Sequence, residues 1–366
     1  MSSHPAPQHT EEQDMIPGKI EIAGRSIGAG QPAFVIAEVG QAHDGSLGNA
    51  YAYVDAVAES GADAIKFQTH IATAESTIDE PFRVKFSKQD DSRFAYWQRM
   101  EFTPEQWHGL AEHARERGLI FLSSPFSVAA VRLLASLGMP AWKIGSGEFR
   151  SSELLEAMLA TGKPLLLSTG MATYAEIAAA VDLVGTRGGS LALLQCTTKY
   201  PTALPDVGLN VIDELKQRFR VPVGLSDHSG QLWPAVIATA RQADLIEVHV
   251  VFDRRMFGPD TKASLTLDEL SQLCDARDAA YEMDSQPVDK DAMAAELATM
   301  RDLFTKSVCV VEPLRAGTVL TAEMLTAKKP GTGIPAGELV SLIGRRLRQD
   351  VEPSRLLRYE DLDDQA

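Results

Sequence analysis

Eight short apolar runs recur along this chain, and each ends in a cluster of polar residues. The runs are rich in Val, Ile, Leu and Phe, as strands buried on both faces must be. Between them lie amphipathic stretches such as PEQWHGLAEHARERG, long enough for a helix and closed by Gly. Eight alternations of strand and helix predict a (β/α)8 barrel, whose strands converge at their C-terminal ends on one active site. The runs read AFVIAEVG, DAIKFQTH, LIFLSSPF, AWKIGSGE, PLLLSTGM, LALLQCTTKYP, PVGLSDHS and LIEVHVVF.

The length of the chain, 366 residues, exceeds what one hydrophobic core usually organises, so a second, smaller domain is expected. A hairpin from Lys19 to about Ile27 would plug the bottom of the barrel, and the polar insertion 72–100 after the second strand is expected to be a lid or a substrate loop. Short β-like runs and turns near the C-terminus predict a small, mostly β domain. The predicted divisions are a disordered tail (1–16), the barrel with its hairpin (17–283), a linker helix (284–306) and the small domain (307–366).

The formal net charge of −15 disfavours a nucleic-acid or anionic-membrane partner, because either needs a basic face. No apolar run approaches the ~20 residues of a membrane span, and the N-terminus lacks the apolar segment of a signal peptide. Three scattered cysteines suggest a reducing compartment rather than a disulfide framework. We therefore expect a cytoplasmic protein.

Two lysines, Lys66 and Lys143, lie inside the predicted strands, where a charge is costly unless it meets an anion. One interpretation is a structural ion pair with an acidic neighbour inside the barrel. The other is a cradle for phosphate or carboxylate, which we favour because hydroxyls surround the two lysines and would complete an oxyanion shell. These hydroxyls belong to Ser124, Ser146, Thr198 and Ser226.

Two histidines end adjacent strands, His228 in LSDHS and His249 in EVHVV. Adjacent strands lie about 5 Å apart, so both imidazoles can share one ion, although either alone would be read as a core residue. Two nitrogen donors among many oxygens favour Mn²⁺, or Mg²⁺ or Co²⁺, over closed tetrahedral Zn²⁺. Cys196, one position inside the sixth strand, reads more simply as a small core residue than as a third ligand.

Three acidic residues also lie at or just beyond strand ends. Glu38 and Glu148 end the first and fourth strands, where they can pair with the lysines, transfer protons or bind sugar hydroxyls. Asp260 follows the eighth strand and is expected to contact a polyol.

The motifs IAEVGQAHDGS, IKFQTH, FLSSPFS, KIGSGE, LSTGM, CTTKYPT, GLSDHS and GPD, in this order, resemble those of the sialic acid synthases over residues 18–362. KKPGTG near the C-terminus resembles part of their SAF (antifreeze-like) domain. The resemblance implies condensation of phosphoenolpyruvate with N-acetylmannosamine or a related sugar. It also implies a domain-swapped homodimer in which Lys329 and the PGTG turn close the partner's active site.

The resemblance assigns a role to each candidate residue. It implies metal ligands at His228 and His249, a phosphoenolpyruvate site at Lys66, Ser124, Lys143, Ser146, Thr198 and Ser226, and a sugar site at Glu38, Gln68, Glu148, Tyr200 and Asp260. Two positions depart from the family pattern: Thr198 replaces a common Asn, and Lys329 replaces a common Arg. Because Lys lacks the planar fork of Arg, the identity of the sugar stays open.

The resemblance thus implies a transferase of sialic acid biosynthesis, similar to N-acetylneuraminate synthase, that forms a nine-carbon 2-keto-3-deoxy acid and phosphate. Glu38, Glu148, Lys66 and His249 are its expected catalytic residues. A legionaminic or pseudaminic acid synthase acting on a diacetamido-trideoxyhexose is the nearest alternative. A sugar-phosphate substrate is disfavoured because no Arg-rich strand end is apparent. A more distant alternative is a non-catalytic sugar-binding barrel, for which the histidines and lysines would be incidental.

Overall fold

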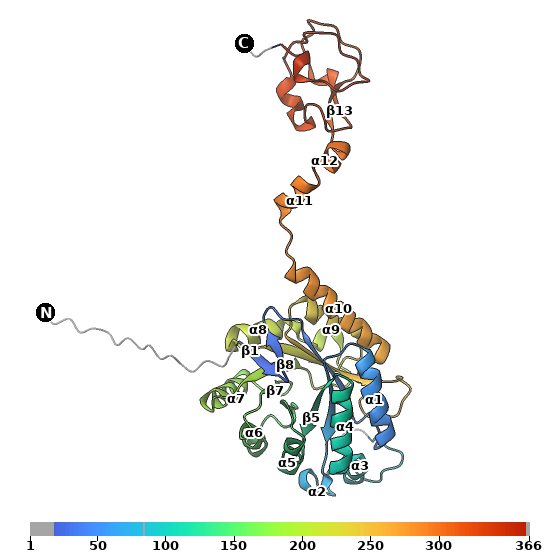
Figure 1. Cartoon of the computed structure of the whole chain (residues 1–366), viewed down its shortest axis with the longest axis vertical. Helices are drawn as coiled ribbons and strands as arrows, with labels where there is room; N and C mark the ends of the chain where they lie inside the picture. Colours follow the sequence, from blue (N-terminus) through green and yellow to red (C-terminus); the bar gives the residue numbers. More distant parts are fainter. Residues whose placement is uncertain (1–17, 83–84, 364–366) are drawn as a thin grey trace, which may run out of the picture. The chain divides into compact units, whose positions relative to one another are not determined.

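The computed structural model describes residues 18–82 and 85–363, and the predicted disordered tail 1–16 lies outside them. The described chain divides into two compact units between Ser285 and Gln286 (Figure 1). In the described part of the chain, we find no helix with the length and apolar character that crossing a membrane requires.

The first unit is the predicted barrel. Its eight parallel strands follow the order β5-β4-β3-β10-β9-β8-β7-β6, and β5 also lies beside β6, which nearly closes the ring. Each predicted apolar run forms one of these strands, and their side chains are almost all buried. The strands are β3 (Phe34–Gly40), β4 (Ala64–Thr69), β5 (Ile120–Pro125), β6 (Trp142–Ile144), β7 (Leu165–Ser168), β8 (Leu191–Cys196), β9 (Val223–Asp227) and β10 (Leu245–Val251). A short ninth strand, β11 (Ser264–Thr266), pairs in parallel with β10.

Helices surround these strands, as Figure 1 shows. Each buries an apolar stripe against the sheet, and side-chain caps fix where several begin. Thr103 and Thr173 form capping boxes with Gln106 and Glu176 at the starts of α4 and α7. The helices are α1 (Leu47–Glu59), α4 (Pro104–Glu116), α5 (Val128–Ser136), α6 (Ser152–Leu159), α7 (Tyr174–Thr186), α8 (Leu209–Phe219), α9 (Leu232–Ala240) and α10 (Leu267–Ser285).

The hairpin expected near the N-terminus is present as β1 (Lys19–Ile22) and β2 (Arg25–Gly28). Ile20, Ile22 and Ile27 are buried in the same core as the barrel strands. Arg25 forms a 2.9 Å ion pair with Asp63, which directly precedes β4. The hairpin therefore packs at the N-terminal ends of the strands, opposite the end where an active site is expected.

The insertion after β4 contains α2 (Ala72–Glu75) and α3 (Arg93–Met100). Arg99 on α3 donates to Asp90 within the insertion and to Asp44 in the loop after β3, each at 2.8 Å. These bonds fix the insertion beside the C-terminal ends of the first two barrel strands.

The second unit has a small core of its own, which includes Val308, Val310, Leu325 and Ile334. Strands β12 (Ser307–Val310) and β13 (Leu325–Lys328) pair antiparallel, and short 3-10 helices and bridges complete the unit. The linker predicted over 284–306 is helical over most of its length, but α10 extends to Ser285 and the linker forms two short helices rather than one. They are α11 (Lys290–Glu296) and α12 (Ala298–Phe304), with φ −87° and ψ 14° at Leu297 breaking the helix between them.

Candidate active site

A cavity of about 1000 Å³ opens at the C-terminal ends of the barrel strands. It is lined by strand ends, the loops after them and residues of the insertion. All of the candidate residues in the first unit line this cavity, whereas Lys329 belongs to the second unit. The lining candidates are Glu38, Lys66, Gln68, Ser124, Lys143, Ser146, Glu148, Thr198, Tyr200, Ser226, His228, His249 and Asp260.

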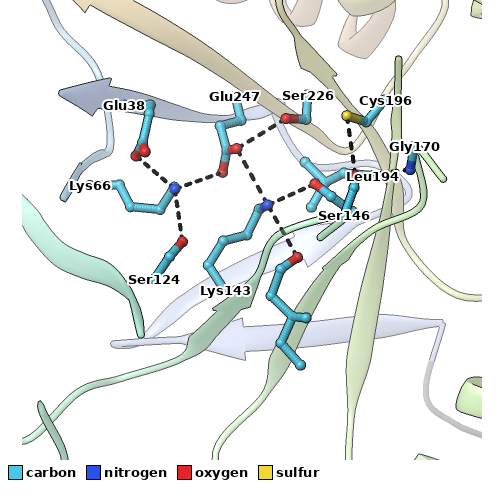
Figure 2. Close-up of polar contacts among 12 residues, drawn as sticks. Glu38, Lys66, Ser124, Lys143, Ser146, Gly170, Leu194, Cys196, Ser226 and Glu247 are labelled. Carbon is cyan, nitrogen blue, oxygen red and sulfur yellow. Dashed lines mark hydrogen bonds and ion pairs between the residues drawn. The ribbon is translucent and has the colours of Figure 1, made fainter. Parts of the chain in front are cut away.

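Two buried lysines and two buried carboxylates alternate across the floor of the cavity, as Figure 2 shows. The Nζ atom of Lys66 lies 2.7 Å from Glu38 and 3.8 Å from Glu247. The other oxygen of Glu247 lies 3.4 Å from the Nζ atom of Lys143. The lysines therefore pair with carboxylates, which was the structural alternative to an anion cradle, and they still face the cavity.

Three of the four charged groups, Lys66, Lys143 and Glu247, also meet a hydroxyl. Lys66 donates to Ser124 at 3.1 Å, and Lys143 donates to Ser168 at 2.7 Å. Ser226 donates to Glu247 at 3.0 Å. These bonds hold the ammonium and carboxylate groups in fixed positions, as a preorganised anion site requires.

Two further hydroxyls complete this side of the cavity. Ser146 accepts the backbone N–H of Gly170 at 3.0 Å. The buried hydroxyl of Thr198 has no hydrogen-bond partner among the described residues. A buried hydroxyl without a partner is costly, so Thr198 marks a position where a ligand oxygen would be favourable.

The charges of these four residues depend on one another. Burial lowers the pKa of Lys143, and the nearby Glu247 offsets this only in part. Lys66 is equally buried, but the two carboxylates it faces outweigh burial and raise its pKa. Burial alone would raise the pKa of Glu247, yet the two lysines bring it down to about 2. Glu247 is thus an ionised carboxylate that both lysines share.

The two imidazoles predicted to hold a metal lie together, with ring centroids 5.4 Å apart. The Nδ1 atom of His228 lies 3.0 Å from the carbonyl oxygen of Thr197, and its Nε2 lies 3.1 Å from the hydroxyl of Tyr200. Burial, together with the neighbouring His249, lowers the pKa of His228 to about 3. His228 is therefore neutral, with Nδ1–H donating to the carbonyl, and its Nε2 lone pair accepts the Tyr200 hydroxyl when no metal ion is bound.

This arrangement fits a metal that keeps open coordination positions. A carbonyl that fixes the tautomer of an imidazole is the usual support for a histidine ligand. Within residues 18–82 and 85–363, no group of three or more His, Cys, Asp or Glu side chains could hold a metal. The two imidazoles thus suit an octahedral ion completed by water and substrate better than a closed tetrahedral Zn²⁺ site.

The sugar-site candidates lie beside this charged floor. Gln68 donates to Glu38 at 2.9 Å, which links it to Lys66. Burial, and then the charge of nearby Glu75, raises the pKa of Glu148. Glu148 therefore retains its proton to a higher pH than an exposed glutamate and is the candidate best suited to act as an acid.

Some residues of the cavity are not among the candidates that the sequence predicts. One is Glu247, which lies inside the apolar run LIEVHVV. It stands two positions before His249, on the same face of the strand, and an acidic residue in such a run is a signal that the sequence does carry. His70 lies 2.5 Å from Glu75 and stacks between Trp97 and Phe126. No pattern in the sequence predicts that contact, because it depends on how the insertion folds.

Profiles of two protein families match this chain. The profile of the NeuB family matches residues 53–288, and that of the SAF domain matches residues 305–363. N,N'-diacetyllegionaminic acid synthase of Campylobacter jejuni is 32% identical over 88% of this chain and 98% of its own. Human N-acetylneuraminate-9-phosphate synthase is 31% identical over 95% of this chain and 98% of its own.

A solved structure is also similar to this chain. The N-acetylneuraminic acid (sialic acid) synthetase of Leptospira borgpetersenii, in complex with citrate, superposes with a TM-score of 0.68 at 29% identity. The match covers 78% of this chain and 97% of that one.

Proposed function

The chain belongs to the NeuB family, and on that basis we propose that it condenses phosphoenolpyruvate with an open-chain hexosamine. The products would be a nine-carbon 2-keto-3-deoxy acid and inorganic phosphate. The observation that carries this proposal is the pair of buried lysines at the cavity floor, ringed by fixed hydroxyls. A phosphate and a carboxylate on one small molecule match two ammonium groups held at separate points.

The cavity residues account for each step of the reaction. Lys66 and Lys143 would hold the phosphate and carboxylate, so that carbon 3 of phosphoenolpyruvate faces the aldehyde carbon of the sugar. The new bond forms between these carbons, and Glu148 would give its proton to the aldehyde oxygen as that oxygen gains charge. Water then adds to carbon 2 and returns one of its protons to Glu148, and phosphate leaves with cleavage of the carbon–oxygen bond and takes the other proton.

His228 and His249 would hold a divalent ion, Mn²⁺ in preference to Mg²⁺ or Co²⁺. When bound, such an ion supplies Lewis-acid polarisation of the aldehyde. Because each imidazole is essential to this site, His228→Ala and His249→Ala should each abolish turnover, and a chelator should do the same to the wild-type enzyme. Full activity in excess EDTA would show that the reaction needs no divalent ion.

We propose N-acetylmannosamine or a related hexosamine as the sugar. A diacetamido-trideoxyhexose is the second candidate, because the insertion lines the cavity with aromatic rings. Phe82, Phe86, Tyr96 and Trp97 offer apolar surface to a second acetamido methyl group. The kinship with a legionaminic acid synthase is consistent with this second candidate.

We further propose a cytoplasmic homodimer. Cys196, Cys274 and Cys309 are all free thiols, as a reducing compartment allows. Helices α11 and α12 leave Met293, Leu297, Met300 and Phe304 at least 37% exposed, a stripe that a second copy of the chain would cover. In the proposed dimer the SAF unit, with Lys329, closes the partner's cavity.

A panel of hexosamines, scored by phosphate released from phosphoenolpyruvate, tests the proposal. Phosphate release that depends on one of the acetamido or diacetamido sugars supports it. Binding of such a sugar with no phosphate release in the presence of Mn²⁺ would favour the non-catalytic barrel instead.

A further inference from the structure

Glu247 occupies the centre of the anion site, although its carboxylate would repel a bound anion. It bridges Lys66 and Lys143 and accepts a hydrogen bond from Ser226 (Figure 2). It is 4% exposed, and the two lysines are 2% and 3% exposed. Its position follows from the sheet, because Glu247 on β10 is in register with Ser226 on β9.

The formal charges at this floor cancel. Lys66 and Lys143 contribute two positive charges, while Glu38 and Glu247 contribute two negative ones. Of the two lysines, Glu38 pairs only with Lys66, so Glu247 is the sole carboxylate within 4 Å of Lys143 among the described residues. Without it, Lys143 would be a buried charge with no counter-ion, which is strongly unfavourable.

We propose that Glu247 is a positioning residue that keeps the anion site electrically neutral, so that inorganic phosphate binds weakly enough to leave after each turnover. The role of phosphate as a product rests on the proposed function. An incoming anion competes with Glu247 for the two lysines. This competition follows from geometry alone, since the anion and Glu247 must share the same two ammonium groups.

Glu247→Gln tests this inference, because it keeps the size of the side chain and an oxygen to accept from Ser226. Titration calorimetry of the full-length protein with inorganic phosphate, without added divalent cation, measures the affinity directly. We expect the dissociation constant for phosphate to fall about tenfold. This change is smaller than the full electrostatic effect of removing one unit charge a few ångström from the anion. The matched control is Glu148→Gln, which makes the same carboxyl-to-amide replacement in the same cavity and should alter the affinity by less than about twofold.

The kinetic constants of Glu247→Gln should change in a pattern that a loss of structure does not produce. If the site holds anions too tightly, KM for phosphoenolpyruvate and the inhibition constant for phosphate both fall while kcat also falls. A structural defect would instead raise KM. Phosphate affinity that is unchanged or weaker in Glu247→Gln would overturn the inference.

Two further measurements apply if Glu247→Gln folds poorly. Added phosphate should then raise its Tm more than that of the wild-type protein, since the ligand supplies the missing negative charge. The double variant Lys143→Met/Glu247→Met removes both charges and should bind phosphate no more tightly than the wild type. Absence of the Tm gain, or tight binding by the double variant, contradicts the inference. If the binding pattern holds but no hexosamine releases phosphate, the proposed function fails and the counter-charge role stands.

Discussion

At the scale of single residues, the anion site depends on one position without a side chain. Gly170 lies against Ser146, Thr198 and Cys196, and a Cβ added there would come within 2.6 Å of the Thr198 hydroxyl and 2.8 Å of the Ser146 hydroxyl. Contacts this short require the hydroxyls to move. The absence of a side chain at Gly170 therefore leaves room for those hydroxyls to face a ligand.

Gly170→Ala should consequently weaken phosphoenolpyruvate binding. Displacing these two hydroxyls should raise KM for phosphoenolpyruvate about tenfold, with a smaller change for the sugar. Steady-state kinetics with each substrate varied in turn measures this. Gly48→Ala is the control, because its Cβ would meet nothing closer than 3.9 Å. Equal effects on both substrates would show that the residue does not shape the anion site.

Glu148 should govern the dependence of activity on pH. Burial and Glu75 raise its pKa, so its acid form persists to higher pH and is lost as the pH rises through that raised pKa. Activity should therefore decline on the alkaline side of this pKa. Glu148→Gln, which has no proton to give, should be about a hundredfold slower or more and should lack this decline. An identical decline in Glu148→Gln would assign it to another group.

At the scale of elements, the barrel was predictable and its internal pairings were not. Strands buried on both faces leave a plain signal in apolar runs, and the polar residues that follow mark the active end. Contacts between strands depend on register, which the sequence does not display. The pairing of Lys143 with Glu247 joins β6 to β10 across the barrel, and the break at Leu297 has no Gly or Pro to announce it. The partners of Glu247 and His70 are therefore visible only in the folded chain, although an acidic residue inside the apolar run LIEVHVV is itself a signal in the sequence.

The insertion between β4 and α4 should be held in place chiefly by Arg99. Its bonds to Asp90 and Asp44 connect the insertion to the loop after β3. Arg99→Met keeps the aliphatic stem but removes these bonds, and should cost about 1–3 kcal/mol of unfolding free energy. It should also raise KM for the sugar several-fold more than KM for phosphoenolpyruvate.

Arg187→Met provides the comparison for Arg99→Met. Arg187 pairs with the exposed Glu156 on the outer surface, where an ion pair contributes little. Chemical denaturation and kinetics of both variants separate the two cases. If Arg99→Met leaves sugar kinetics unchanged, the insertion does not shape the sugar site.

At the scale of the whole molecule, the proposed exchange of SAF units between subunits can be tested by mixing inactive variants. One variant carries His249→Ala, and the other lacks the chain from Ser307 onward. In a swapped heterodimer, one site combines an intact barrel with the intact SAF unit of the other chain. Activity should return to a fraction of wild type once subunits exchange. Confirmed exchange without activity would assign each SAF unit to its own barrel.

The most direct test of the account follows the bridging oxygen of phosphoenolpyruvate. With ¹⁸O between carbon 2 and phosphorus, carbon–oxygen cleavage should place the label in the released phosphate. The sugar acid should have the combined mass of sugar, phosphoenolpyruvate and water, less phosphoric acid. We expect labelled phosphate and this nine-carbon acid in equal amounts, formed only when both substrates are present. Unlabelled phosphate, or phosphate released without a new sugar acid, would contradict the proposed condensation.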